Sequence, residues 1–221
     1  MTERGGGDAE PKRRHERARR AVFGHLGPAI LHETNNVLTV MAGVRQIMKS
    51  SAPVSDRIGT MIDEQLVRME QLVASIRRIG PDDVMAGEPR RTLPAIADAL
   101  EQIVRLAGKG RGVTVERGEL ADAEPADPEA LALASLCLVL PLFPPRGASG
   151  ASRLLLSGTT NEKSVSLALA YSPLRELLFA EDEAVARALA AAVGGSCDVR
   201  LDATGYAATL AVPAAAPEQD A

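Results

Sequence analysis

At positions 30 to 39 the chain reads Ile30-Leu31-His32-Glu33-Thr34-Asn35-Asn36-Val37-Leu38-Thr39. Apolar residues recur around this stretch at steps of three and four, which predicts a long amphipathic helix. His32 and Asn36 are four residues apart, so they lie on one face of that helix. The apolar seam lies on another face and comprises Ile30, Val37, Met41, Val44 and Met48. We therefore expect His32 to point away from the helix packing.

The polar residues of this stretch indicate a chemical role. A neutral imidazole next to a carboxylate, as in His32-Glu33, is a nucleophile with a proton acceptor beside it. Two successive asparagines, Asn35 and Asn36, lower the stability of a helix interior. A surface histidine without a function would leave this interruption of the helix unexplained. A helical zinc site of the H-E-x-x-H type is disfavoured, because position 36 would need a second histidine.

These residues also resemble a known family. The run from His32 to Thr39 is similar to the H-box of two-component sensor histidine kinases, which lies in their dimerisation and histidine-phosphotransfer helix hairpin. The resemblance implies that His32 is the phosphoacceptor, that Glu33 takes its proton, and that Asn36 positions a water when a partner is dephosphorylated. The family usually has proline where this chain has Val37, a change that removes a kink and touches no chemistry.

A helical hairpin is expected around the H-box-like stretch. The first helix is predicted from about Arg17 to Lys49, and residues 50–55 form the turn. The second helix carries an unbroken heptad seam, which consists of Ile58, Ile62, Gln65, Met69, Leu72, Ile76 and Ile79. A lone hairpin has too little core to be stable. We therefore expect residues 17–81 to form a four-helix bundle as a homodimer, with His32 of each chain facing outward.

After a polar linker at residues 82–91, the pattern changes to mixed helices and strands. Helices are predicted at 93–107, 127–140 and 183–193, and strands at 113–116, 153–157, 164–170, 197–201 and 207–212. This order resembles the ATP-binding domain of the same kinases, most closely at residues 188–213. The predicted fold class is therefore α+β: an antiparallel helical hairpin forming a dimeric four-helix bundle, followed by a degenerate histidine-kinase-type ATPase-like α/β sandwich over residues 92–213. Residues 1–16 are expected to be a disordered or basic tail, and residues 214–221 a disordered tail.

The predicted sandwich lacks the residues with which that family binds nucleotide. Counting from Asp127, the family's two asparagine positions hold Cys137 and Pro141, and neither is an oxygen ligand for Mg²⁺. The position of the adenine-reading aspartate holds Tyr171. No Gly-x-Gly occurs in residues 151–192, although such glycines let backbone N–H groups approach phosphates. We therefore expect no ATP binding and no autophosphorylation.

Composition limits the other functions. The 221 residues carry a net charge of −4 and include two tyrosines, three phenylalanines and no tryptophan, so we expect no nucleic-acid binding. The longest apolar run, residues 130–143, is too short to span a bilayer, and the N-terminus lacks the apolar core of a signal peptide. A cytoplasmic protein without a membrane segment is expected. The basic run at residues 12–20 is either a solvated tail or a docking surface for an acidic partner.

Together these features favour a histidine phosphotransferase built as a cut-down sensor kinase. His32 would carry a phosphoryl group between the aspartates of receiver domains, with a cognate hybrid kinase as donor, and Asn35 and Thr39 would contact the receiver. The receiver would bring the Mg²⁺, so no cofactor of the chain's own is expected. One alternative is a response-regulator phosphatase that uses Asn36 with Glu33. Another is a non-catalytic adaptor that docks on a kinase or regulator, and an active kinase is the least favoured.

Overall fold

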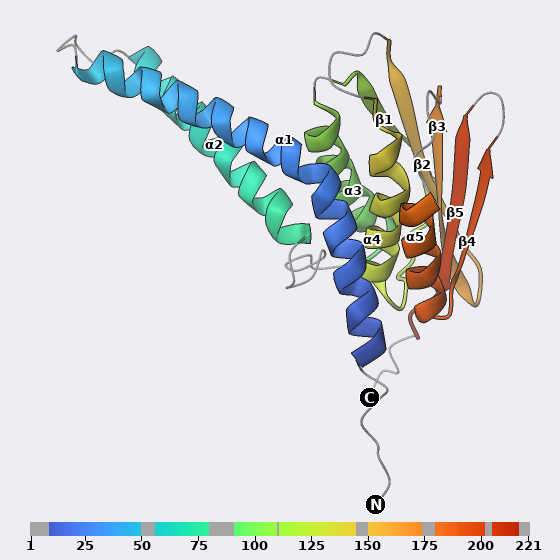
Figure 1. Ribbon diagram of the computed structural model, residues 1–221. Coiled ribbons are helices and arrows are strands. Elements are labelled where there is room, and N and C mark those ends of the chain that lie inside the picture. Colours follow the sequence, from blue (N-terminus) through green and yellow to red (C-terminus); the bar gives the residue numbers. More distant parts are fainter. Residues whose placement is uncertain are drawn as a thin grey trace, which may run out of the picture.

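A helical hairpin projects from a sandwich of helices and a sheet in the computed structural model (Figure 1). The structure describes residues 9–49, 56–79, 91–109, 111–144, 150–173, 180–201 and 205–216. Within these ranges the hairpin comes first and a mixed five-stranded sheet with its helices follows, which confirms the predicted α+β class. Among the described residues, no helix is both long enough and apolar enough to cross a membrane. The expected turn and linker lie outside the described residues.

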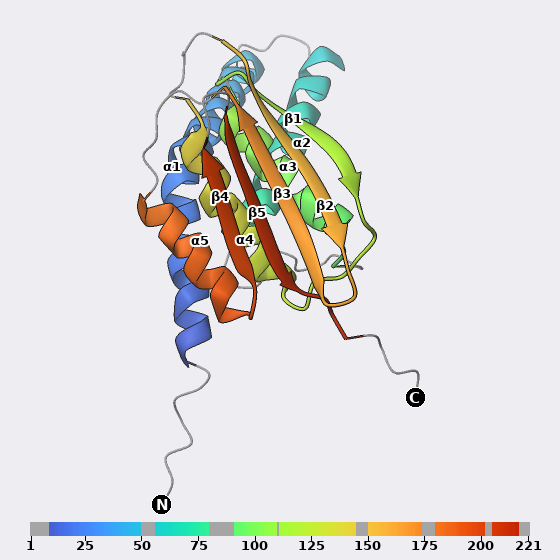
Figure 2. The same cartoon turned by 90° about the vertical axis from the view of Figure 1, so that its right-hand side faces the viewer.

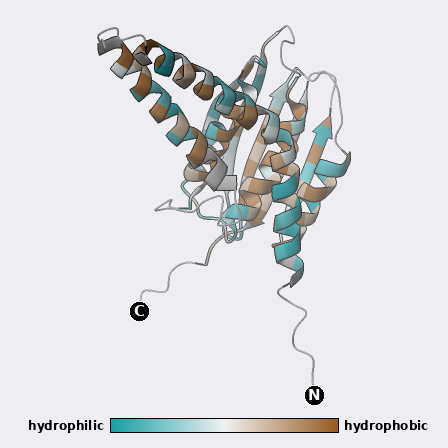
Figure 3. Ribbon diagram, turned by 60° about the vertical axis from the view of Figure 1, so that its left-hand side comes forward, coloured by the Kyte–Doolittle hydropathy of each residue, from teal (hydrophilic) through white to brown (hydrophobic). Residues whose placement is uncertain are grey.

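The hairpin consists of α1 (Ala9–Lys49) and α2 (Asp56–Ile79). Their facing sides bury five residues of the predicted seams and half-bury Ile62 and Met69. The five are Val37, Val44, Ile58, Gln65 and Leu72. Met41 and Met48, expected in the same seam, are largely exposed, because a single hairpin has no further helix to cover them. Apolar segments recur along both hairpin helices, including their outer surfaces (Figure 3).

Helix α1 begins at Ala9, so residues 9–16, expected in a disordered or basic tail, are helical. The cause is a second apolar face on its first half, where Ala18, Val22 and Leu26 are fully buried against the sandwich. α1 bends part-way along its length (Figure 1) and contains Pro28, which cannot donate the usual helix hydrogen bond. One helix therefore belongs to both units.

The sandwich follows the predicted order of elements, and its strands are longer than predicted. Its helices are α3 (Leu93–Gly108), α4 (Pro128–Val139) and α5 (Ala180–Ala192), with a short 3₁₀ turn, η1 (Leu140–Leu142). Its strands are β1 (Val113–Leu120), β2 (Ser152–Thr160), β3 (Ser164–Ser172), β4 (Ser196–Leu201) and β5 (Tyr206–Pro213). The sheet order is β1-β2-β3-β5-β4, with β1 parallel to β2 and the other pairs antiparallel.

The core lies between the sheet and its helices. Strands β3 and β5 alternate buried and exposed residues, so only one sheet face is covered, and Figure 2 looks onto the open face with α3 and α4 behind it. Helix α4 is apolar all round and buried all round, because the sheet covers one side and α1 the other. Gly194 ends α5 with a φ of +75°, and a side chain at Gly195 would overlap the main chain of β5.

Candidate functional site

His32 lies on the solvent-facing side of α1, just beyond the part of this helix that packs on the sandwich. Its side chain is exposed, and Asn36, one turn later, is exposed on the same face. Asn35 and Thr39 are also exposed, and the Thr39 hydroxyl donates a hydrogen bond to the main-chain oxygen of Asn35 at 2.8 Å. The polar H-box-like residues therefore form one accessible strip on α1, with the exception of Glu33.

Glu33 lies on a different face of α1 and is buried. Both of its carboxylate oxygens accept hydrogen bonds from the Lys109 ammonium at the C-terminal end of α3, at 2.6 and 2.7 Å. Neighbouring residues on a helix do not face each other, so sequence adjacency alone does not bring this carboxylate to the His32 imidazole. In this arrangement the proton-accepting oxygens of Glu33 are engaged by Lys109.

An apolar stripe runs along α1 beside the polar strip. It comprises Leu31 and Leu38, which are 65% and 59% exposed, and Met41 and Met48. On α2, Leu66 and Val73 are likewise exposed and seven residues apart. In each of the three pairs, Leu31 and Leu38, Met41 and Met48, and Leu66 and Val73, the two residues lie seven positions apart. This heptad spacing is typical of a surface that packs against further helices.

At positions that the resemblance assigns to nucleotide contacts, this chain has side chains that are buried in the core. Cys137 on α4 is fully buried, and its Sγ lies 3.8 Å from the main-chain oxygen of Ala18 on α1. Burial raises the pKa of this thiol to about 12, and the nearby Asp182 adds to the effect. Tyr171 is also buried, and its ring stacks on Phe143 with centroids 6.2 Å apart. The first half of α1 thus occupies the side of the sandwich formed by α4 and α5.

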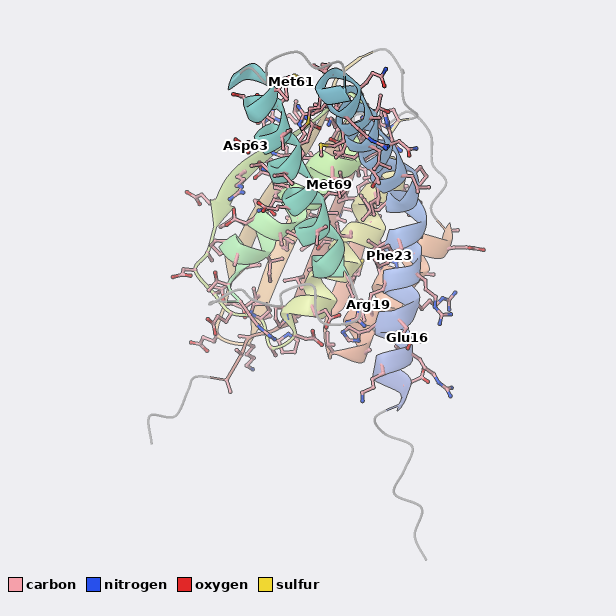
Figure 4. The ribbon with its side chains drawn as sticks, turned by 90° about the vertical axis from the view of Figure 1, so that its left-hand side faces the viewer. Glu16, Arg19, Phe23, Met61, Asp63 and Met69 are labelled. Atoms are coloured by element: carbon pink, nitrogen blue, oxygen red, sulfur yellow. The ribbon has the colours of Figure 1, made fainter. Side chains whose placement is uncertain are left out.

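Charged contacts, which local sequence patterns do not predict, hold this first half of α1 on the sandwich. Arg14 donates a hydrogen bond to the main-chain oxygen of Ala188 at 3.2 Å. His25 Nε2 lies 3.1 Å from Asp182 Oδ2, and Arg19 pairs with Glu129. Arg19 and Phe23 lie one turn apart on α1 (Figure 4). Part of the basic run therefore serves an internal interface, while Arg13, Arg17 and Arg20 stay exposed.

Asp127, at the start of α4, belongs to the same interface. Its side chain accepts a hydrogen bond from the Ala130 amide at 2.8 Å, and its second oxygen lies 3.6 Å from His15 Nε2. Burial on its own raises the pKa of this carboxyl, but the His15 and Ala130 contacts outweigh it and lower the pKa. The sequence signal for this cap was the Asp-Pro-Glu start of α4.

In the described part of the chain, no group of three or more histidine, cysteine, aspartate or glutamate side chains is arranged to hold a metal ion. No protein-family model matches the chain, and no curated protein matches its sequence.

Solved structures with a similar arrangement include three histidine kinases. Acinetobacter baumannii histidine kinase AdeS is 15% identical with a TM-score of 0.44, over 82% of this chain and 97% of that one. A histidine kinase from Burkholderia phymatum STM815 is 14% identical with a TM-score of 0.48, over 98% of this chain and 100% of its own. The Erythrobacter litoralis EL346 blue-light activated histidine kinase is 12% identical with a TM-score of 0.47, over 85% and 59%. Values this low establish neither a family nor an activity for this chain.

Proposed function

We propose that the protein is a histidine phosphotransferase that carries a phosphoryl group on His32 between receiver-domain aspartates and does not load itself from ATP. The observation that carries the proposal is the exposed strip of His32, Asn35, Asn36 and Thr39, which presents the H-box-like residues to a partner. The imidazole is the one strong nucleophile on that strip.

The reaction needs only the histidine and the receiver. A lone pair of one imidazole nitrogen attacks the phosphorus of the aspartyl phosphate, an N–P bond forms, and the P–O bond breaks to return a carboxylate to the receiver. The proton on the other ring nitrogen passes to a base or is kept until the reverse step. Transfer to a second receiver runs the same steps backwards. The receiver supplies Mg²⁺, which offsets charge on the transferring group.

Glu33 is the proposed base, and this role requires a change from the arrangement described. Its carboxylate must leave Lys109 and turn toward the face of α1 that carries His32. A receiver docked on the exposed strip would lie next to both residues. We infer that docking is coupled to this release, so that the base becomes available when a partner is present.

The proposal that ATP is not bound rests on the α4 and α5 side of the sandwich. Cys137 stands where the resembling family has an asparagine, and α1 covers it. A thiol with a raised pKa is a poor ligand for a hard cation such as Mg²⁺. Nucleotide entry at this face would require Ala18, Val22 and Leu26 to leave the core, which is costly.

A homodimer is part of the proposal. The exposed stripe on α1 (Leu31, Leu38, Met41 and Met48) and the exposed positions on α2 (Leu66 and Val73) would face a second hairpin in a four-helix bundle. The polar strip with His32 lies on another part of α1, so dimerisation would leave the imidazole accessible to a receiver.

The test is transfer of labelled phosphate. Purified protein is incubated with labelled ATP alone, and then with a phosphorylated receiver domain. We expect no label from ATP and acid-labile label from the receiver, and none on a His32→Ala variant. Label from ATP alone, or equal label on His32→Ala, contradicts the proposal.

A receiver phosphatase is the second candidate, and the exposure of Asn36 one turn from His32 favours it. The Asn36 amide would orient a water for attack on the aspartyl phosphate. An Asn36→Ala variant separates the two functions, because it should stop dephosphorylation of the receiver and retain transfer to His32. The adaptor alternative requires that substitution of either residue leaves the cellular effect unchanged.

A further inference from the structure

A cleft of about 570 Å³ lies between the hairpin and the sandwich, on the side of α1 that carries Glu33. Its walls come from three elements: α1 with Glu33, α2 with Arg68, and α3 with Gln102, Arg105 and Lys109. Figure 4 looks onto α2, on which Met69 is labelled, and α3 lies beyond it. Neither His32 nor any other residue of the exposed strip lines this cleft, and Glu33 is the one residue that it shares with the proposed transfer site.

The cleft is cationic. Among the described residues, three basic side chains and one carboxylate line it. This carboxylate, Glu33, already accepts hydrogen bonds from Lys109 at both of its oxygens. Arg105 pairs with Glu101, yet Glu101 is shared with Arg117, and both cations together lower the pKa of this carboxyl although burial opposes the shift. Positive charge in the cleft therefore exceeds what its own acidic residues neutralise.

Arg68 is the most informative of these cations. Helix α3 ends at the cleft, so its dipole by itself explains basic residues at positions 105 and 109. It does not explain Arg68, which comes from a different helix. Arg68 also borders a groove with Asp63 and Glu64, yet it forms no ion pair with either carboxylate or with any other residue in the part of the chain that the structure describes. Two guanidinium groups from separate helices at one cleft fit the planar oxygens of a phosphate or carboxylate.

We propose that this cleft binds a small molecule with several negative charges, carried on phosphate or carboxylate groups, and that Arg68, Arg105 and Lys109 contact these groups. Gln102 adds amide donors at the edge. Because Lys109 also holds Glu33, the bound anion competes with the Glu33 carboxylate for this ammonium. The ligand class follows from the excess of cations, and its size follows from the volume of the cleft.

The competition has a regulatory consequence that rests on the proposed function. An anion that takes Lys109 releases Glu33, the residue expected to accept the His32 proton. The same cleft joins the hairpin to the sandwich through α2 and α3, so its occupant also fixes the relative position of these helices. A cellular anion would in this way set the rate of phosphoryl transfer without touching His32.

Isothermal titration of the full-length protein at low ionic strength tests the site. Inorganic pyrophosphate and citrate are the two probes, since they separate phosphate-bearing from carboxylate-bearing ligands. We expect saturable binding of at least one probe with one site per chain. Arg68→Gln and Arg105→Gln should each weaken it about tenfold, as expected for loss of a charge-assisted hydrogen bond. Arg200→Gln, on an exposed arginine of β4 far from the cleft, is the matched control and should bind like the wild type.

Glu33→Gln tests the competition. It removes the resident carboxylate and frees Lys109, so the same probe should bind about threefold to tenfold more tightly. Absence of saturable binding by either probe, or unchanged affinity in both Arg68→Gln and Arg105→Gln, overturns the site. Unchanged or weaker binding in Glu33→Gln overturns the competition. None of these measurements involves a receiver or phosphoryl transfer, so they stand even if the His32→Ala experiment rejects the proposed function.

Discussion

The two halves of α1 differ although they form one continuous helix. In the first half Ala18, Val22 and Leu26 are fully buried on α4 and α5, and ion pairs flank them. In the second half Leu31 and Leu38 remain more than half exposed. The first half packs against the sandwich of the same chain, whereas the second half exposes an apolar stripe to solvent. The proposed dimer interface therefore falls on the hairpin and not on the sandwich.

Leu26→Ala should have the largest effect on this comparison. Removing a fully buried leucine leaves a cavity between α1 and the sandwich, and we expect the free energy of unfolding to fall by about 3 kcal/mol. Urea unfolding followed by circular dichroism measures it. Leu31→Ala is the matched control in the second half and should cost less than about 0.5 kcal/mol in a monomeric sample. Equal losses of unfolding free energy in Leu26→Ala and Leu31→Ala would show that the two halves of α1 are packed alike.

Leu38→Asp should act on association and spare the fold of the chain. A carboxylate in the exposed apolar stripe would be desolvated in a four-helix bundle but hydrated in a single hairpin. Sedimentation velocity should show a dimer for the wild type and a monomer for the variant, with little change in helix content. A wild-type monomer at tens of micromolar, or a dimeric variant, would exclude this stripe as the interface.

Lys109→Ala sharpens the comparison at the junction of the two halves. It leaves the Glu33 carboxylate buried without the Lys109 ammonium that donates hydrogen bonds to it, which we expect to cost about 1 to 3 kcal/mol in the free energy of unfolding. Arg20→Ala provides the control, because Arg20 forms an exposed pair with Glu16 one turn away and should change stability by less than about 0.5 kcal/mol. A loss in Lys109→Ala no larger than the control's would show that Glu33 readily reaches water.

The smallest predicted effect is a pH dependence from the first half of α1. The pKa of Asp127 is lowered in the folded protein, so its contacts stabilise the fold above the unfolded pKa of about 4 and this contribution is lost as the pH falls through the folded value. Asp127→Asn keeps the helix cap but cannot ionise. Its free energy of unfolding should be below the wild type's at pH 7, by about 1 kcal/mol or less, and should approach it at pH 3. If the difference in unfolding free energy between the wild type and Asp127→Asn widened in acid, the lowered pKa of Asp127 would be contradicted.

Periodic patterns predicted most of the fold. The heptad seam from Ile58 to Leu72 and the order of helices and strands along the chain both follow from spacing, which is a local property of the sequence. The early start of α1 was missed because residues 9–16 are mostly polar and basic and show no apolar period, whereas Ala18, Val22 and Leu26 lie inside the predicted helix. Glu33 shows what local patterns leave out: its partner, Lys109, is distant in sequence and only the tertiary fold brings them together. The role of Glu33 as a base stays a prediction.

Cys137 offers a consequence of the way α1 covers α4. Its thiol is fully buried beneath the main chain of Ala18 and, with its raised pKa, stays protonated near neutral pH, so it should resist alkylation while the helix is seated. Cys197, the other cysteine, is only partly buried and should react first. In a Cys197→Ser variant, the alkylation rate of Cys137 would therefore measure how often the first half of α1 separates from α4. Such a separation would also be needed before a nucleotide could enter at this face.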